Sequence, residues 1–343
     1  MADAGSKIRD VSKAVAVAAG SWAVAGGLAA YAAARLTSAD DGRRTEASLV
    51  PVLLSFTPQV TKAAPWAALG LRLTGQRKPA ATAAVAAGAL SLLLQSRKLP
   101  KWQPGASGAR LRVLTCNMFF GRGDAEVLVD RVRRLEADVL FLQELTADAV
   151  TRLKQAGLDE LMPYTQIELR GGPRGSGIYS RFPLGEGPAL EPIHAAQPTA
   201  VVELPDGYRA ELVCVHPCPP ASEHRGAATR WRGELGSLTP PGDLPRIVAG
   251  DFNATLDHAA FRNVLRLGYA DAALGAGTSL NPTWGMPGKN PVLTLDHVLV
   301  DTDCAVLDSS VHLIPGSDHR AVYAEIQLPE LESESDSPQG SAE

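Results

Sequence analysis

The stretch RIVAGDFN at residues 246–253 decides the fold of the second part of this 343-residue chain. Residues 246–249 predict a short, largely apolar strand, and the polar residues Asp251 and Asn253 follow it directly. A carboxylate at the end of a buried strand is costly unless it is paired or binds a metal ion. The stretch therefore predicts a polar site at the end of this strand.

Five other segments each deliver an acid, an amide or an imidazole at or near the end of a strand. They supply Asn117 after 111–116, Gln143 and Glu144 after 139–142, His216 after 212–215, Asp296 and His297 after Leu295, and Asp318 and His319 after 316–317. One shared cation would account for several of these acids at once.

The residue types favour a hard divalent cation. Oxygen ligands from Asp, Glu and Asn suit Mg²⁺ or Mn²⁺ and match a structural zinc site poorly. A histidine beside a carboxylate is a ready general base, or a cation that stabilises a crowded phosphate. The sequence has neither a Gly-x-Ser-x-Gly elbow nor a P-loop, so serine hydrolases and P-loop triphosphatases are disfavoured. Metal-assisted attack of water on a phosphorus ester fits what remains.

Composition separates the chain into two parts. Residues 1–100 carry 12 Lys and Arg against 5 Asp and Glu, whereas the whole chain has a net charge of −4, so the remainder is acidic. An acidic second part argues against loose binding to long nucleic acid. Four cysteines do not form a disulfide framework at this length, and Cys116, Cys214 and Cys304 lie in apolar runs that predict buried free thiols.

The N-terminal region, residues 1–100, contains three apolar stretches with basic flanks, at 14–34, 48–71 and 79–96. A membrane-spanning helix needs about 20 apolar residues, which the first and third stretches supply. The second is interrupted by Lys62 and three prolines. We expect two or three transmembrane helices; a cleaved signal peptide ending near 32–34 and an Ala-rich soluble helical region are the alternatives. The basic residues on the two sides of three spans tie at six each, so charge does not set the orientation.

The rest of the chain alternates between strand and helix patterns. Residues 101–110 predict a linker, 111–328 a catalytic domain, and 329–343 a disordered acidic tail. Strands are predicted at 111–116, 139–142, 177–180, 200–204, 210–215, 246–249, 295–300, 305–313 and 321–327. Helices are predicted near 127–135, at 146–156 with Thr146 as N-cap, at 222–238 and at 258–267. This mixture predicts two sheets with helices packed outside them.

Five motifs, in this order and at these separations, resemble the endonuclease/exonuclease/phosphatase superfamily, which has the metal-dependent DNase I-like fold. They are CNMFFG (116–121), VLFLQE (139–144), GDFN (250–253), LDHVLV (295–300) and SDH (317–319). The resemblance covers about residues 111–327. It implies an α/β fold, a four-layered sandwich of two central sheets flanked by helices, here preceded by the N-terminal membrane-helix region.

The resemblance also implies roles for individual residues. The Mg²⁺ or Mn²⁺ ligands would be Glu144 as the principal one, Asn117 beside it, and Asp318 directly or through water. Asp251 and Asn253 would hold the attacking water and a phosphate oxygen.

Two imidazoles would complete the implied site. His319, oriented by Asp296, would contact the scissile phosphate and act in acid–base chemistry. His216 would bind the phosphate from the opposite side. The reaction would be in-line displacement at phosphorus.

Several residues also have plainer interpretations. Asn117 and Asn253 could be turn residues, and Glu144 could interact favourably with the dipole at the N-terminus of the following helix. Arg181, after the strand at 177–180, and Trp284, in NPTWG, resemble family positions on the substrate side, although Arg181 could be structural and Trp284 a buried core residue. His297 is expected to be structural, and the remaining histidines to lie on the surface: His194, His224, His258 and His312.

The sequence therefore favours a membrane-anchored, divalent-metal-dependent phosphoric-ester hydrolase. The architecture resembles a membrane-tethered bacterial branch of the superfamily, including proteins like teicoplanin-resistance factors, which implies an extracytoplasmic domain acting on lipid-linked phosphates. The expected partners are a phosphate-ester substrate and the membrane, with nucleic acid less favoured and no obligate protein partner. An extracytoplasmic nuclease and a non-catalytic binding module with the same fold are the alternatives.

Overall fold

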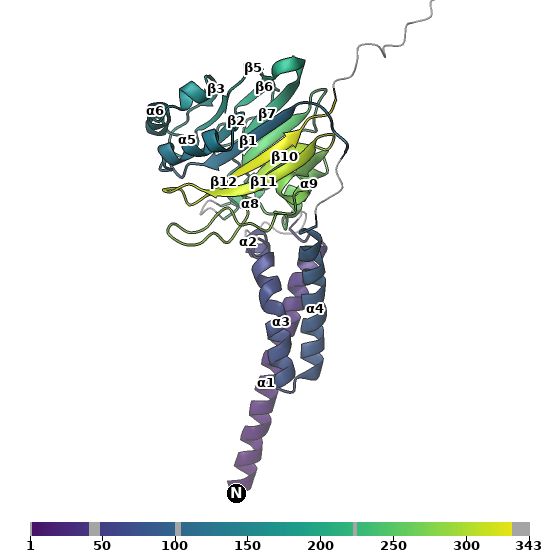
Figure 1. The fold of residues 1–343 in the computed structure, drawn as a ribbon. Coiled ribbons are helices and arrows are strands. Elements are labelled where there is room, and N and C mark those ends of the chain that lie inside the picture. Colours follow the sequence, from purple (N-terminus) through teal and green to yellow (C-terminus); the bar gives the residue numbers. More distant parts are fainter. Residues whose placement is uncertain (1, 41–48, 100–103, 222–224, 331–343) are drawn as a thin grey trace, which may run out of the picture.

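A computed structural model describes residues 2–40, 49–99, 104–221 and 225–330, with the backbone alone at 2–12 (Figure 1). Two six-stranded sheets form the body of the molecule. The first has the order β11 (Ala305–Leu313), β12 (Arg320–Gln327), β1 (Arg110–Asn117), β2 (Val139–Gln143), β4 (Ser176–Ser180), β3 (Tyr164–Glu168). The second has the order β5 (Leu184–Glu186), β6 (Thr199–Glu203), β7 (Arg209–Val215), β8 (Arg246–Asp251), β10 (Asp296–Asp301), β9 (Tyr269–Asp271).

Apolar side chains from both sheets meet in one central core, which includes Val113, Phe141, Leu212, Ile247 and Val298. Helices cover the outer faces, each with its own apolar cluster: α5 (Ala125–Arg134), α6 (Ala147–Gln155) and α7 (Leu158–Leu161) on the first sheet, α8 (Ala227–Gly236) and α9 (Ala259–Leu265) on the second. The α/β sandwich of two mixed sheets flanked by helices is confirmed. The short helix α10 (Ala272–Gly275) follows β9.

Strand register brings the polar strand ends together. Asn117 pairs with Gln143 across the parallel strands β1 and β2, and Asp296 pairs with Asp251 across β10 and β8. Gly250 at φ 152° lies against β7, where an added Cβ would come within 2.0 Å of the Val215 carbonyl oxygen. The glycine in GDFN thus permits the close strand approach that positions Asp251.

Three strands were not predicted: β3, β5 and β9. Two of them have only three residues, and β3 is largely exposed at the edge of its sheet. Such edge strands are held by hydrogen bonds to a neighbour, so they show no apolar pattern of their own. Thr146 caps α6 as predicted, accepting a hydrogen bond from the Ala149 N–H. The predicted linker reaches the sheet, since β1 begins at Arg110, and most of the predicted tail lies outside the described residues.

The N-terminal helices form a bundle that projects from the sandwich, with the N-terminus at its far end (Figure 1). The helices are α1 (Ala2–Leu36), α2 (Leu49–Leu54), α3 (Thr57–Leu73) and α4 (Arg77–Ser96), and α1, α3 and α4 pack together. Small residues such as Ala25, Ala68 and Ala83 fill the inside of this bundle, whereas Trp66 and Leu92 are exposed on its outside.

A buried ion-pair triad fastens this bundle to the sandwich. Asp257, which precedes α9, accepts hydrogen bonds from Arg35 Nε at 2.5 Å and from Arg97 Nη2 at 2.5 Å. The two arginines lie at the sandwich-side ends of α1 and α4, and all three side chains are buried. The bundle and the sandwich therefore meet in a specific polar interface.

His258 was expected on the surface, and that prediction was wrong. Its ring is fully buried in the same interface, where Nε2 lies 2.8 Å from the Pro51 carbonyl oxygen and 3.1 Å from Ser55 Oγ. An imidazole has two hydrogen-bonding edges, so it can be buried once both find partners; Nδ1 accepts from the Thr255 N–H. His224 lies outside the described residues.

Candidate active site

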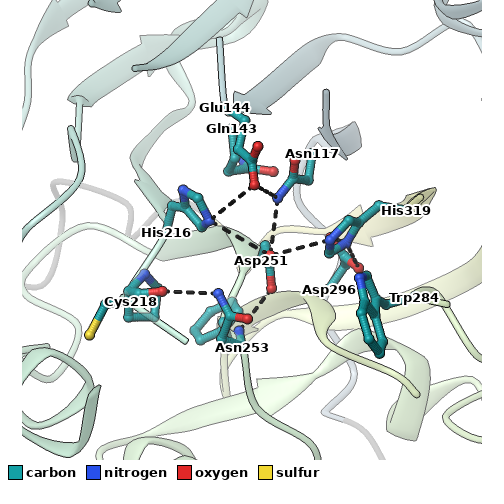
Figure 2. A network of polar contacts seen from close by, with 12 residues as sticks. Asn117, Gln143, Glu144, His216, Cys218, Asp251, Asn253, Trp284, Asp296 and His319 are labelled. Carbon is teal, nitrogen blue, oxygen red and sulfur yellow. Dashed lines mark hydrogen bonds and ion pairs between the residues drawn. The ribbon is translucent and has the colours of Figure 1, made fainter. Parts of the chain in front are cut away.

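The predicted polar residues converge at one edge of the two sheets. Figure 2 shows Asp251 at the centre, with Asn117 and Glu144 on one side, His216 and Asn253 on another, and His319 with Asp296 opposite. The segments that supply them are far apart in the sequence. Asn117, Glu144, His216 and Asp251 come from the carboxyl-terminal ends of β1, β2, β7 and β8, which form two parallel pairs. Asp296 begins β10 and His319 directly precedes β12, and because these strands run antiparallel to β8 and β1 their starts lie at the same edge.

The Asn117 amide joins the two central carboxylates. Its Nδ2 donates to Glu144 Oε1 at 3.2 Å and to Asp251 Oδ2 at 3.1 Å, while its Oδ1 accepts from the Phe119 N–H at 2.9 Å. In this orientation Asn117 holds the carboxylates together, and ligation through Oδ1 would require the amide to turn over.

The backbone at Glu144 is itself specialised. Glu144 has φ 53°, in the left-handed region that non-glycine residues seldom adopt, and its Oε2 accepts a hydrogen bond from the Phe120 N–H at 2.7 Å. Asn253 has φ 48°, and its N–H donates to Asp251 Oδ1 at 2.8 Å. Strained conformations of this kind persist where the surrounding structure fixes them, typically at functional sites.

His319 is held by a chain of hydrogen bonds. Its Nδ1 lies 2.8 Å from Asp296 Oδ2, which also accepts from the Thr283 hydroxyl at 2.6 Å. This arrangement leaves Nε2 facing the cluster, 3.6 Å from Asp251 Oδ2. This contact places Asp296 where it can hold the His319 ring in one orientation.

The remaining predicted residues surround this core. His216 Nε2 lies 3.8 Å from Asp251 Oδ2 and 3.9 Å from Glu144 Oε1. Asp318 Oδ2 accepts a hydrogen bond from Trp284 Nε1 at 3.1 Å, and Asn253 Nδ2 donates to the Pro217 carbonyl. Trp284 thus lies at the site, half-buried, and positions an acid.

The structure does not bring Arg181 to this site. Arg181 follows β4, and Ser180 pairs with Val139 at the opposite end of β2 from Glu144. Its guanidinium lies 3.6 Å from Asp138. Because β4 runs antiparallel to β2, a residue after β4 emerges at the other edge of the sheet, so the predicted contact of Arg181 with substrate is corrected to a structural ion pair.

Burial and mutual repulsion disfavour the ionised form of the carboxylates at this site. Burial raises the pKa of Glu144, Asp251 and Asp318, although neighbouring hydrogen bonds and His319 oppose the rise. Burial lowers the pKa of His216. For His319, burial opposes protonation, but the Asp296 and Asp251 carboxylates outweigh it and raise its pKa to about 10.

The donor set fits a divalent cation. Several oxygens face one space, and within the described residues the buried Asp318 Oδ1 has no hydrogen-bond partner. A cation there would lower the raised carboxylate pKa values and satisfy that oxygen. Asp251, Asp296 and His319 also offer ligand atoms within 4.8 Å of one another. Asp296, however, already accepts hydrogen bonds from His319 and Thr283, so the side facing Glu144 and Asp251 suits the ion better.

Two groups of site residues escaped the sequence interpretation. Thr283 holds Asp296, and the Ser317 hydroxyl donates to the Asn117 carbonyl and accepts from the His319 N–H. In the sequence, only the position of Thr283 next to Trp284 and of Ser317 next to Asp318 could have indicated that they belong to the site. The second group comes from the N-terminal bundle: Val52, Ser55 and Phe56 line the same cavity of about 580 Å³ as Glu144 and His319.

The pH behaviour of His319 follows from its neighbours. In metal-free protein we expect its imidazole to remain protonated at pH 8, because its pKa lies at about 10. The raised pKa means that its ion pairs stabilise the fold fully below about pH 6.5 and lose this effect as pH rises through about 10. ¹⁵N-histidine NMR in the presence of chelator would measure it, with His312, whose pKa burial lowers, as an internal reference. A neutral His319 at pH 8 would contradict the prediction.

Comparison with known proteins fits this geometry. Residues 114–319, more than half of the chain, match the Endonuclease/Exonuclease/phosphatase family. The chain belongs to this family. As a member of the endonuclease/exonuclease/phosphatase family, it is a hydrolase of the nuclease and phosphodiesterase class.

Solved structures show the same fold at low sequence identity. An endonuclease/exonuclease/phosphatase from Beutenbergia cavernae is 18% identical with a TM-score of 0.52, over 64% of this chain and 72% of that one. A D. rerio TDP2 humanized by 14 mutations is 19% identical with a TM-score of 0.51, over 63% of this chain and 98% of that one. An AP endonuclease from Archaeoglobus fulgidus is 14% identical with a TM-score of 0.51, over 62% of this chain and 98% of that one. A comparison with curated proteins gave no match.

Proposed function

We propose that this family member is a membrane-anchored, divalent-metal-dependent hydrolase that attacks a phosphoric ester with water, and that its substrate is a membrane-proximal or lipid-linked phosphate. One observation carries the proposal: Glu144 and Asp251 are joined by Asn117, and the Asp296-held His319 faces them. The cation, Mg²⁺ or Mn²⁺, would supply charge neutralisation at the phosphate and would be held by Glu144 with Asp318, and by Asn117 if its amide turns over.

The chain's own residues would then divide the work. Asp251 and Asn253 hold the attacking water and a phosphate oxygen. His319, held by Asp296, offers its Nε2 proton to the phosphate, and its raised pKa keeps this proton in place at neutral pH. His216, held neutral by burial, lies within reach of the same phosphate from the other side.

The outer surface of the bundle supports a membrane anchor. Two helical segments, Lys13–Leu36 and Arg77–Ser96, are long and apolar enough to cross a membrane. Bulky side chains such as Trp22, Trp66 and Leu92 face outward, whereas alanines fill the inside. Small residues between helices and large apolar residues outside are typical of helices packed in lipid. The contact of α1 with α4 and the Arg35 ion pair favour an anchor over a cleaved signal peptide.

The extracytoplasmic side of the catalytic domain is proposed from the resemblance to the membrane-tethered branch. The N-terminus and the turn between α3 and α4 lie on the side away from the sandwich. On the sandwich side, two of the six basic residues counted from the sequence, Arg35 and Arg97, are ion-paired with Asp257. Because the positive-inside rule counts basic residues whether or not they are paired, the count of six on each side stays a tie.

A substrate panel tests the function. The full chain in detergent should hydrolyse at least one phosphate ester with Mg²⁺ and lose that activity with chelator. The panel should contain plasmid DNA, RNA, inositol phosphates, sphingomyelin and polyprenyl pyrophosphate, and we expect turnover of a lipid phosphate. Turnover of DNA alone would favour an extracytoplasmic nuclease, and no Mg²⁺-dependent turnover of any substrate would favour a non-catalytic binding module.

A further inference from the structure

The corner between α2 and α3 forms one wall of the catalytic cavity. Val52, Ser55 and Phe56 line the same space as Glu144, Asp251 and His319. These residues come from the N-terminal bundle, about 90 residues before Glu144 in the chain. The bundle therefore contributes to the site directly.

The cavity lining combines the ionisable cluster with apolar side chains, some of them at the helix corner. Val52 and Phe56 supply apolar lining from the helix corner, and Leu293 and Phe120 supply more from the sandwich; the Phe120 N–H donates to Glu144 Oε2. Arg174 and Arg230 lie elsewhere on the lining. A ligand that fills this space has an anionic group near the carboxylate cluster and its cation, and an apolar portion against the helix corner.

The position of the helix corner is fixed. Ser55 Oγ and the Pro51 carbonyl bond to His258, and Gln59 Nε2 donates to the Val292 carbonyl at 2.5 Å. Phe56 itself is 37% exposed although it is a large apolar residue. An aromatic ring held at a cavity wall and left partly uncovered can bind an apolar group without rearrangement.

We propose that the Phe56 wall is a subsite for the hydrocarbon chain of an amphiphilic phosphoester, so that the N-terminal bundle selects substrates by chain length. The occupant is a lipid chain because the outward-facing apolar helices that would enter a membrane lead directly to this wall. Leu53 on α2 is also exposed there but does not line the cavity. This proposal rests on the proposed phosphoester function and adds the residue that recognises the chain.

Binding of two non-hydrolysable phosphonates tests this subsite. Calorimetry would measure the Kd of ethylphosphonate and hexylphosphonate for the full chain in detergent with Mg²⁺. Burying one methylene strengthens binding about fourfold, so hexylphosphonate should bind at least about tenfold more tightly. In Phe56→Ser this preference should fall to less than about threefold, with ethylphosphonate binding unchanged. Serine is a favourable N-cap residue, so the start of α3 is preserved at this position.

Two further variants control the measurement. Phe56→Leu should keep the preference, since it retains an apolar side chain, and Leu53→Ser should also keep it. A tenfold preference that survives in Phe56→Ser, or that Leu53→Ser loses equally, would overturn the subsite. Equal binding of both phosphonates by the unmodified protein would overturn it while leaving phosphate recognition intact. Binding of neither would instead refute the proposed phosphoester function.

Discussion

Replacing His319 by alanine should lower kcat/KM for the best substrate by at least about two orders of magnitude, the usual scale for a general acid–base group. The imidazole is nine-tenths or more buried, is held by Asp296 at 2.8 Å and faces Asp251 at 3.6 Å. Its removal takes away both a proton donor and a positive charge beside the carboxylate cluster. Steady-state rates with Mg²⁺ would measure the loss.

Two variants separate chemistry from folding in that experiment. His312→Ala removes a histidine from β11, where it is bonded to Ser310 away from the site, and should leave the rate unchanged. Asp296→Asn keeps the shape of the orienting group but removes its charge, so it should shift the pH profile of kcat as well as lower it. An unchanged rate in His319→Ala would mean that the site is assigned to the wrong residues.

Replacing Asp257 by alanine should destabilise the full chain by about 3–5 kcal/mol, the range found when one partner of a buried ion pair is removed. The substitution leaves the Arg35 and Arg97 guanidiniums buried without their carboxylate. At an unfolding entropy of about 2.1 cal/mol/K per residue, such a loss lowers the Tm of a chain of this size by about 4–7 °C. Thermal unfolding in detergent would measure the shift, with the exposed Asp303→Ala as a matched control.

The same triad predicts acid sensitivity. Burial alone would raise the pKa of Asp257, but hydrogen bonds and charge from Arg97 and Arg35 outweigh burial and lower it. Its stabilising effect is therefore present above about pH 4 and is lost as pH falls through the lowered pKa. Equal stability of Asp257→Ala and the unmodified chain at pH 7 would show that the bundle is not fastened through this carboxylate.

The fold and most of the catalytic cluster could be predicted from local sequence because local patterns encode them. Apolar runs that end in Asn117, Glu144 or Asp251 mark buried strands with polar ends, and parallel strands place such ends at one edge. Family order supplied the roles of these residues. Arg181 was misplaced because local sequence does not say which edge of the sheet a strand's end will reach.

The sequence by itself determined the strands with an apolar pattern, where a cation would be favourable and that two N-terminal helical segments are membrane-length, since these properties depend on residue type and period along the chain. Tertiary structure alone decided the contacts of Asp257 with Arg35 and Arg97, and the place of Phe56 in the catalytic cavity. The two ion pairs join residues 222 and 160 positions apart in the chain. They depend on how the bundle packs against the sandwich, and the pattern of apolar residues along the chain does not predict that packing.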